Sequence, residues 1–334
     1  VPPSDASSGT SAVTRRAFLA AGAWAGTGAA WAQPAGDWPT KPLRIIVPAP
    51  PGGPFDRLIR PIAQDMAATL GQPIVIDNRP SAGNIVGTQA GAQAAPDGYT
   101  LTMTGMINTI TAGLHDKLPY DIVQDFVHIS AIGEGAQWLV TRADAGINTL
   151  AELLARARKE PGKLAYASSG AGSSGHLLME LLQRATGTEF LHVPYKGGAP
   201  ALNDTLGGVV PLLAIPQNAV QAHVQAGRLK GLAVSGQARS PAAPQVPTFA
   251  ELGYPQLTVT TWVGLSAPKG TPATVVRKVH AALQATLAKP AITDPHVAEG
   301  LAIMKTSPEQ YSALVRSDAE RWGTLVRALN LKAQ

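Results

Sequence analysis

The sequence predicts an α/β protein of two lobes, in which each lobe is a mostly parallel sheet flanked by helices. Two observations carry this prediction. Strand-like and helix-like segments alternate over residues 43–103 and again over residues 163–206, and short right-handed crossovers fold such β-α-β runs into parallel sheets. About 300 residues also exceed what one hydrophobic core usually holds, so two lobes are expected.

The first alternation is read from apolar periodicity and from Gly and Pro residues that end each segment. The expected segments are strand Leu43–Val47, helix Phe55–Leu70 ended by Gly71, strand Pro73–Asp77, loop Asn78–Asn84, helix Val86–Ala95 and strand Tyr99–Met103.

The second half repeats this pattern with shorter strands. Its expected segments are a strand within 129–142, a capped amphipathic helix Thr149–Lys159, a strand beginning at Lys163, helix His176–Thr186, strand Phe190–Val193, helix Gly197–Leu206, strands Leu212–Ile215 and Gly231–Val234, and helices Thr271–Leu287 and Pro308–Leu329. We expect the chain to cross between the lobes near 132–137 and to return near 260–265. The predicted lobes are residues 38–132 plus 265–334, and residues 133–264, with the carboxy-terminal helices packed on the first lobe and a ligand cleft between the two lobes.

Residues 1–32 are predicted to form an export signal. Arg15-Arg16 gives a twin-arginine pattern, the soft apolar run Ala20–Trp31 follows, and small residues at Ala30 and Ala32 place cleavage before Gln33. A chance pair of arginines before a short apolar helix is the alternative. The apolar run is too short to be a good membrane span, so we expect a soluble protein outside the cytoplasm.

Composition excludes several classes of protein. The formal net charge is +5, and the basic residues are spread along the chain without a run of Lys or Arg, which argues against nucleic acid as a partner. There is no cysteine, which excludes disulfides, thiol catalysis and thiolate metal ligands.

Two glycine-rich turns predict an anion clamp. The first turn is Pro48–Asp56 and the second, the serine-rich turn, is Ser168–His176; each follows a predicted strand and precedes a helix. Unpaired N–H groups and the positive end of the helix dipole then point at one place, which suits an anion. Asp56 is more readily read as a cap of its helix than as a ligand contact.

The serine-rich turn also matches the glycine pattern of a dinucleotide-binding fingerprint. The next strand, however, ends at Pro194 with no acid to hold a ribose, and Glu189 stands at the wrong end of that strand. A carboxylate cradle, with serine hydroxyls added to the amides, is therefore favoured over nicotinamide binding, and a purely structural turn is the other reading. A third strand-to-helix turn, Tyr195–Pro200, brings Lys196 as a full positive charge.

No catalytic or metal-binding set of residues is recognisable. Ser174 lacks the glycine spacing of a nucleophile elbow. His176 and Glu180 are one helical turn apart, but no second histidine completes a zinc motif. We expect His176 to orient a nearby backbone or side-chain group, and we expect no enzyme activity, cofactor or metal.

A series of short motifs runs along the chain: Trp38-Pro39-Thr40-Lys41-Pro42, the Pro48–Asp56 turn, Leu70-Gly71-Gln72-Pro73, Asp77-Asn78-Arg79-Pro80, Ala95–Leu101, Lys117–Asp121, the Ser168–His176 turn, Val193–Gly198, Ala226–Val234, Val246-Pro247-Thr248 and Gly270-Thr271-Pro272. In these motifs and their order, residues 38–330 resemble the Bug family, the exported solute receptors of tripartite tricarboxylate transporters.

The resemblance implies a type II periplasmic-binding-protein, or Venus flytrap, architecture without enzymatic activity. It also implies that amides of the two turns hold a ligand carboxylate in the cleft and that a membrane permease receives the ligand. The candidate ligand-binding residues are Ala49, Pro50, Pro51, Gly52, Gly53, Gly83, Gly105, Asn108, Ser168, Ser169, Gly170, Ala171, Gly172, Ser173, Ser174, His176, Lys196, Gly197 and Ile215.

Three departures from the family pattern affect this prediction. The family commonly has a phenylalanine near Ala49 and an acid in the strand after Gly207-Gly208, whereas Val210–Pro216 contains no acid. Ile215 therefore argues against an amino-acid ligand and favours a carboxylate with an apolar or aromatic body. Twin-arginine export is the third departure.

The expected function is capture of a small organic anion, a di- or tricarboxylate or an aromatic acid, for the permease subunits of a tripartite tricarboxylate-type transporter. One alternative is a sensor that presents its closed form to a membrane histidine kinase. An exported hydrolase or lyase is the less favoured alternative.

Overall fold

The computed structural model describes residues 38–115 and 117–328, and the predicted export signal lies outside them. Ten strands of this part of the chain form one sheet in the order β2-β1-β3-β9-β4-β7-β5-β6, with β8 and β10 also paired to β4. The strands are β1 (Leu43–Val47), β2 (Ile74–Asn78), β3 (Thr100–Gly105), β4 (Phe126–Arg142), β5 (Ala165–Ser168), β6 (Leu191–Pro194), β7 (Leu212–Pro216), β8 (Leu229–Val234), β9 (Thr260–Pro268) and β10 (Leu301–Ile303).

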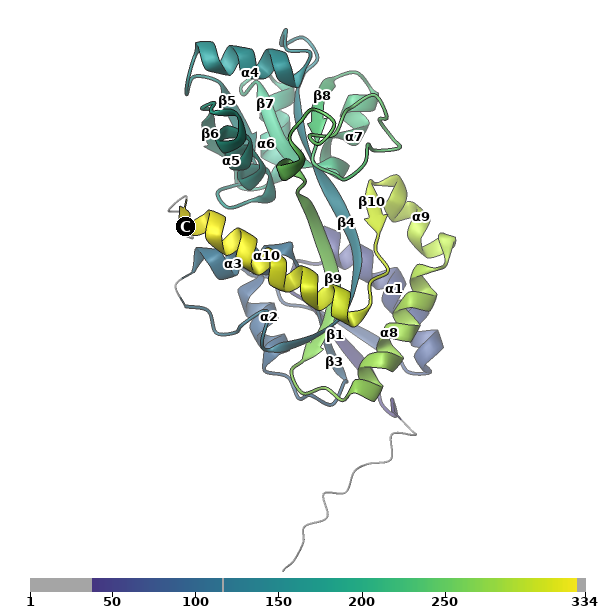
Figure 1. Cartoon of the computed structure of the whole chain (residues 1–334). Helices are drawn as coiled ribbons and strands as arrows, with labels where there is room; N and C mark the ends of the chain where they lie inside the picture. The colour runs from purple at the N-terminus through teal and green to yellow at the C-terminus, as the bar shows by residue number, and fades with distance from the viewer. Residues whose placement is uncertain (1–37, 116, 329–334) are drawn as a thin grey trace, which may run out of the picture. The chain divides into compact units, whose positions relative to one another are not determined.

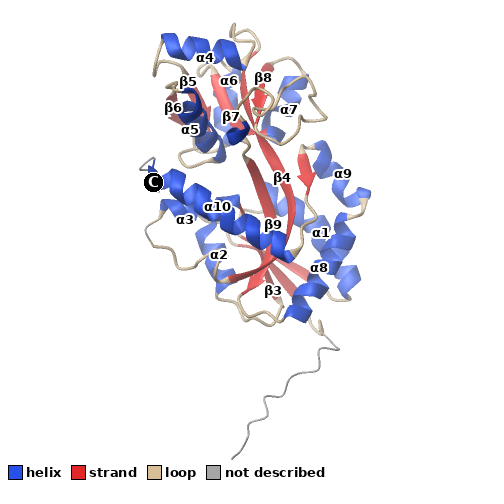
Figure 2. Cartoon of the chain, in the orientation of Figure 1, coloured by secondary structure: helices blue, strands red, loops and turns tan. Residues whose placement is uncertain are grey.

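Helices separate most of these strands along the chain (Figures 1 and 2). The α-helices are α1 (Pro54–Leu70), α2 (Ile85–Ala92), α3 (Met106–Leu114), α4 (Leu150–Lys159), α5 (Ser174–Thr186), α6 (Gly198–Leu206), α7 (Gln217–Gln225), α8 (Ala273–Leu287), α9 (Pro290–Ala298) and α10 (Pro308–Ala328); two short 3-10 turns are η1 (Ala82–Asn84) and η2 (Pro255–Leu257). Among these described helices, none combines the length and the apolar character that a membrane crossing needs.

The sheet consists of two parallel parts joined by antiparallel strands. β1 pairs in parallel with β2 and β3, and β5 pairs in parallel with β6 and β7. The long strand β4 pairs with β9 over Phe126–Ala136 and with β7 from Gln137 onward. Figure 2 shows β4 and β9 running between the two parts. The predicted two-lobed α/β architecture is confirmed, as a mixed sheet, whereas the predicted lobe boundaries at 132/133 and 264/265 stay a prediction.

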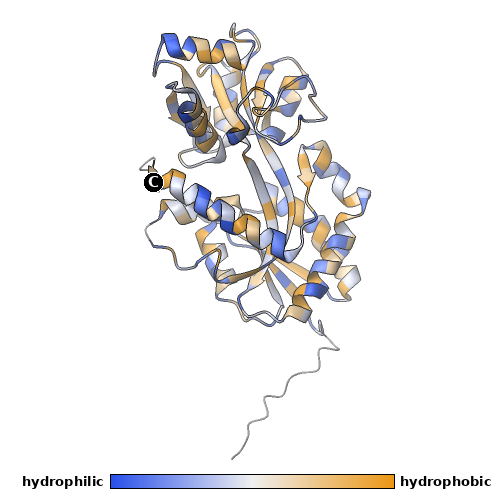
Figure 3. Ribbon diagram, in the orientation of Figure 1, coloured by the Kyte–Doolittle hydropathy of each residue, from blue (hydrophilic) through white to orange (hydrophobic). Residues whose placement is uncertain are grey.

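Apolar side chains of the strands and the flanking helices form the core. In the first lobe, Ile45, Ile59 and Val279 are fully buried members of one cluster that joins β1, α1 and α8. In the second lobe, Tyr166 and Leu178 belong to a cluster that also reaches α10. Figure 3 shows apolar segments along the strands of both lobes. Burial of these apolar side chains packs the helices on the sheet and so brings the ends of the strands, and the turns after them, close together.

Several predicted elements agree closely with the structure. β1 has the predicted bounds, α1 ends at Leu70 with Gly71 in the left-handed region at φ 73°, and Thr149 caps α4 by accepting the N–H of Glu152 at 3.1 Å. α2 ends at Ala92, three residues before the predicted end.

Candidate functional site

Five helices follow the carboxyl ends of strands, either at once or after a short turn, two in the first lobe and three in the second. The turns are β1 to α1, β3 to α3, β5 to α5, β6 to α6 and β7 to α7. In open α/β sheets this edge of the strands is where ligands bind. Residues of the β1–α1 turn and of the β7–α7 turn line one cavity.

The first turn is held by the buried carboxylate of Asp56. Its Oδ2 accepts the N–H of Gly52 at 2.8 Å, and both its oxygens accept hydrogen bonds from Arg60 at 2.7 and 2.8 Å. Asn78 donates to Asp56 Oδ1 at 2.9 Å and to the carbonyl of Ala49 at 3.1 Å. The bond from Arg60 lowers the pKa of Asp56 to about 2 against the opposing effect of burial, with help from Gly52 and Asn78. Asp56 is therefore ionised and shapes the turn.

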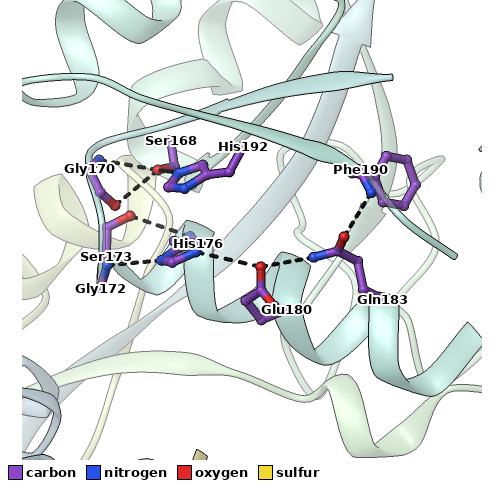
Figure 4. A network of polar contacts seen from close by, with 9 residues as sticks. All are labelled: Ser168, Gly170, Gly172, Ser173, His176, Glu180, Gln183, Phe190 and His192. Carbon is purple, nitrogen blue, oxygen red and sulfur yellow. Dashed lines mark hydrogen bonds and ion pairs between the residues drawn. The ribbon is translucent and has the colours of Figure 1, made fainter. Parts of the chain in front are cut away.

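Side chains of α5 and β6 form hydrogen bonds with the serine-rich turn (Figure 4). The N–H of Gly172 donates to Nδ1 of His176 at 2.9 Å, and Ser173 caps α5 by accepting the N–H of His176 at 3.3 Å. The hydroxyl of Ser168 lies 2.8 Å from Nε2 of His192 and 3.0 Å from the carbonyl oxygen of Gly170. The prediction that His176 orients a nearby group is confirmed.

Two histidines stack beneath this turn. The rings of His176 and His192 lie 4.0 Å apart and 8° from parallel, and Tyr166 stacks on the other face of His192 at 4.8 Å. Burial lowers the pKa of His192 to about 4. Glu180 lies 3.5 Å from Nε2 of His176, and this contact lowers the pKa of the carboxyl. The stacked rings thus support the serine-rich turn from the protein interior, and the imidazole of His192 is neutral at pH 7.

The third turn lies beside the serine-rich turn. A Cβ atom added to Gly198 would lie 3.0 Å from Cδ1 of Ile215 and 3.5 Å from the hydroxyl of Ser169. Ile215 is 1 % exposed and belongs to the second-lobe core. Lys196 is exposed, and Gly197 adopts φ 111° with open space where a side chain would be. The serine-rich turn, the third turn and the end of β7 are therefore neighbours.

At the N-terminus of α3, a side chain of the helix itself accepts a backbone N–H. Asn108 is fully buried; its Oδ1 accepts the N–H of Gly105 at 2.8 Å and its Nδ2 donates to Thr88 at 2.8 Å. The carbonyl of Gly83 accepts a hydrogen bond from Thr111 at 3.2 Å. These groups connect α3 to the neighbouring loop and helix, and they already have partners without a ligand.

The serine-rich turn of the second lobe reaches α3 of the first lobe. A Cβ atom added to Gly172 would lie 3.0 Å from Cδ1 of Leu114, the last residue of α3. Gly172 adopts φ 73°, a conformation that favours glycine. The close approach of the two lobes at this point therefore depends on the absence of a side chain.

A cavity of about 260 Å³ lies between α1 of the first lobe and the start of α7 in the second. We call it the interlobe cavity. Strands β4 and β9 contribute Gly135, Ala136, Thr261 and Val263; α1 contributes Phe55 and Leu58; the β7–α7 turn contributes Pro216, Gln217 and Asn218; and the α9–β10 segment contributes Leu301. None of the predicted ligand residues lines it, although Gly53 and Ile215 are chain neighbours of lining residues.

Sequence reasoning missed the residues of the interlobe cavity because they come from seven separate helices and strands. The available signals were weak: Pro216 directly precedes a helix, and Gly135 interrupts a strand, which marks a close approach or a space to be filled. The structure also shows that the N–H groups of Gly52 and Gly172 have internal acceptors. The free donors of the first turn are instead the N–H groups of Phe55 and Asp56, which have no intrahelical acceptor.

Within residues 38–115 and 117–328, no cluster of three or more His, Asp or Glu side chains could hold a metal ion. His176 and Glu180 are occupied with the turn and with Gln183. The described part of the chain thus presents a cavity and donor-rich turns.

Comparison with known proteins gives the family of this chain. The sequence profile described as "Tripartite tricarboxylate transporter family receptor" matches residues 58–331. Protein BugT of Bordetella pertussis (strain Tohama I) is 36 % identical over 297 residues, which cover 88 % of this chain and 91 % of BugT.

Solved structures show the same fold. Rpa4515 of R. palustris, solved with adipate, is 30 % identical with a TM-score of 0.76, covering 89 % of this chain and 99 % of that one. MatC (Rpa3494) from Rhodopseudomonas palustris, solved with bound malate, is 30 % identical with a TM-score of 0.72, covering 86 % and 99 %.

The fold and the position of the cavity define a two-lobed solute-binding protein of the type II class. The chain belongs to the tripartite tricarboxylate transporter receptor (TctC, or Bug) family. This is a family of periplasmic solute receptors and not of enzymes, so the chain is a receptor.

Proposed function

We propose that this receptor captures a small organic carboxylate between its lobes and delivers it to the integral-membrane permease of a tripartite tricarboxylate-type transporter. The observation that carries the proposal is the interlobe cavity, which α1 and α7 line from opposite lobes. Adipate and malate, the ligands named for two related structures, are both organic carboxylates.

The carboxylate is held by donors that the protein itself leaves free. The first turns of α1 and α7 have no side-chain cap, so their N–H groups are open to an anion. A helix terminus contributes about 0.3–1 kcal/mol per charge, and about 2 kcal/mol when partly buried. Two such termini provide a useful share of the roughly 8 kcal/mol that micromolar affinity requires.

The remaining predicted residues shape these donors or add to them. Gly52, Gly53, Gly170 and Gly172 have internal hydrogen-bond partners and determine the path of the turns. Ser169 and Ser174 are half-buried in the serine-rich turn, and we assign their hydroxyls to the ligand or to bridging water. Closure of the lobes removes water and strengthens every one of these contacts.

We further propose that residues 1–32 direct export by the twin-arginine route, with cleavage before Gln33. The lobe boundaries at 132/133 and 264/265 are proposed as the limits of the two bodies that move when the cleft closes. Hinge motion of this kind is common in periplasmic binding proteins.

A thermal-shift screen of the mature protein over mono-, di- and tricarboxylates tests ligand capture. A ligand present at 100 times its Kd stabilises the protein by about 2.7 kcal/mol, so a binder raises the Tm by several degrees. Uptake of the identified acid by a strain lacking the receptor tests delivery. Loss of uptake is expected; binding together with unchanged uptake would contradict delivery and favour a sensor that acts on a histidine kinase.

A further inference from the structure

We propose that the interlobe cavity accepts the apolar body of a compact monocarboxylate and rejects a second carboxylate. This inference rests on the proposed function and names its ligand class. It separates this receptor from the two relatives whose structures hold the dicarboxylates adipate and malate.

The inner surface of the cavity is apolar. Phe55 and Leu58 line it from α1, and Val263 and Leu301 line it from β9 and β10. Of these, Leu58 and Val263 are less than a tenth exposed. Such a surface stabilises an alkyl or aryl group in proportion to the apolar area that is buried.

Polar side chains deep in the lining are already satisfied by the protein. Nε2 of Gln217 donates to Gln221 at 2.8 Å and to Ser240 at 2.6 Å, and its Oε1 accepts from Trp138 at 3.1 Å. The hydroxyl of Thr261 donates to the carbonyl of Gly135 at 3.0 Å. These groups therefore have little to offer a polar ligand atom.

The charged groups of the lining do not provide a site for a second carboxylate. Arg57 lies 3.8 Å from Glu299, and both side chains are more than half exposed. Burial lowers the pKa of His296, so its ring is neutral at pH 7. Because both helix N-termini hold the first carboxylate, a second carboxylate in this cavity would lose its water without gaining a free cation or a free helix terminus, which is unfavourable. Ile215, at the end of β7, likewise offers no acid to an ammonium group.

The volume limits the size of the ligand. A cavity of about 260 Å³ lies just below the usual range of about 300–1,000 Å³ for ligand pockets. With roughly 30 Å³ for each water-sized group, it holds about nine such groups. Hexanoate and benzoate are of this size.

Gly135 is the position that controls this space. It lies opposite Thr261 in the β4–β9 pair, so the two residues share one face of the sheet. A Cβ atom added to Gly135 would meet only the Thr261 hydroxyl, at 3.8 Å. A larger side chain at Gly135 therefore projects into the cavity without colliding with the backbone.

The test is calorimetric titration of the mature protein with butyrate, hexanoate, benzoate, malate and adipate. Gly135→Leu fills the cavity, and Ala155→Leu adds the same side chain at an exposed position of α4 as the matched control. Val263→Ala enlarges the cavity and serves as the second variant, with octanoate as its probe.

We expect hexanoate and benzoate to bind more tightly than malate and adipate. From butyrate to hexanoate the affinity rises about fourfold per methylene, the equivalent of about 0.8 kcal/mol for each buried methylene. Gly135→Leu weakens hexanoate binding at least about tenfold, Ala155→Leu leaves it unchanged, and Val263→Ala improves octanoate binding relative to hexanoate.

The two proposals fail in different ways. If malate or adipate binds most tightly and Gly135→Leu does not change the affinity for hexanoate, the inference about the cavity is wrong, while capture of an organic acid stands. If Gly135→Leu does not fold, the Val263→Ala variant decides. The inference is overturned if the ratio of octanoate affinity to hexanoate affinity is the same in Val263→Ala as in the unmodified protein. If no acid of the panel binds the unmodified protein, the proposed function is wrong and the inference with it.

Discussion

The backbone N–H of Gly172 donates a hydrogen bond of 2.9 Å to Nδ1 of His176, four residues further along the chain. Because Nδ1 accepts, the neutral ring carries its proton on Nε2, on the side of Glu180. The same glycine lies against Leu114 of the other lobe. One imidazole therefore holds the turn at the point where the two lobes meet.

Replacing His176 by Phe is expected to weaken ligand binding while keeping a flat ring stacked on His192. The buried N–H of Gly172 loses its acceptor, which costs about 1–3 kcal/mol. Urea unfolding and calorimetric titration with the best acid of the thermal-shift screen measure the two effects. Unchanged affinity in a folded His176→Phe protein would show that this bond does not position the turn.

Gly172→Ala is expected to reduce affinity more than its backbone strain explains. The matched control is Gly187→Ala, at φ 61° with open space around it, whereas Gly172 has Leu114 in contact. Both changes carry the left-handed strain of about 1–2 kcal/mol, but only Gly172→Ala pushes the lobes apart. Equal affinities in the two variants would argue that the contact with Leu114 is irrelevant to closure.

Asp56→Ala is expected to destabilise the protein by about 3 kcal/mol and to impair binding. The change leaves the N–H of Gly52 and one N–H of the Asn78 amide without their acceptor and removes the partner of Arg60. Each polar group left unsatisfied costs about 1–3 kcal/mol. Arg60 is 52 % exposed, and without it the Asp56 carboxylate still accepts the N–H of Gly52 and the amide of Asn78, so Arg60→Ala should cost less. Denaturant unfolding compares the two, and a larger loss in Arg60→Ala contradicts this assignment.

Stability should fall in acid because of His128. The ring is buried, with Nδ1 2.9 Å from the Ser266 hydroxyl and Nε2 3.1 Å from the carbonyl of Ile122, and burial lowers its pKa to about 4. A His whose folded pKa lies below its unfolded value of about 6.5 stabilises the protein fully above that value. The contribution, about 3 kcal/mol, is lost as pH falls from about 6.5 to 4.

Urea midpoints at pH 7, 5.5 and 4 check this dependence. His128→Gln should be less stable at pH 7 but should lose less stability between pH 6.5 and 4. His192, whose pKa is also lowered to about 4 by burial, adds a separate loss over the same interval. An identical acid dependence in His128→Gln and the unmodified protein would exclude His128 as a source.

The sequence predicted most strands and helices, but not β9, β10 or α9. The ends of the predicted segments carry clear signals. Gly71 ends α1 in the left-handed region, and Thr149 caps α4. It did not predict α3 or α7, which are nine residues long and begin directly where β3 and β7 end. Without an intervening loop, the apolar run of each strand continues into its helix and the periodicity changes too late to be recognised.

For the candidate site, the sequence indicated the turns but not the partners of their amides. The acceptor of the Gly52 N–H is a carboxylate four residues away, and that of Gly172 is an imidazole at the same spacing. Local spacing alone does not show which atoms of a turn stay free. The interlobe cavity was beyond sequence reasoning because Gly135, Pro216 and Val263 meet only through the sheet.

The most direct test of ligand capture is a crystal structure of the mature protein with the most tightly bound acid of the titration panel. We expect the ligand between α1 and α7, with its carboxylate at the helix N-termini and its apolar body against Phe55 and Val263. A ligand bound outside the interlobe cavity, or a cavity filled only by solvent at saturating ligand, would contradict this account.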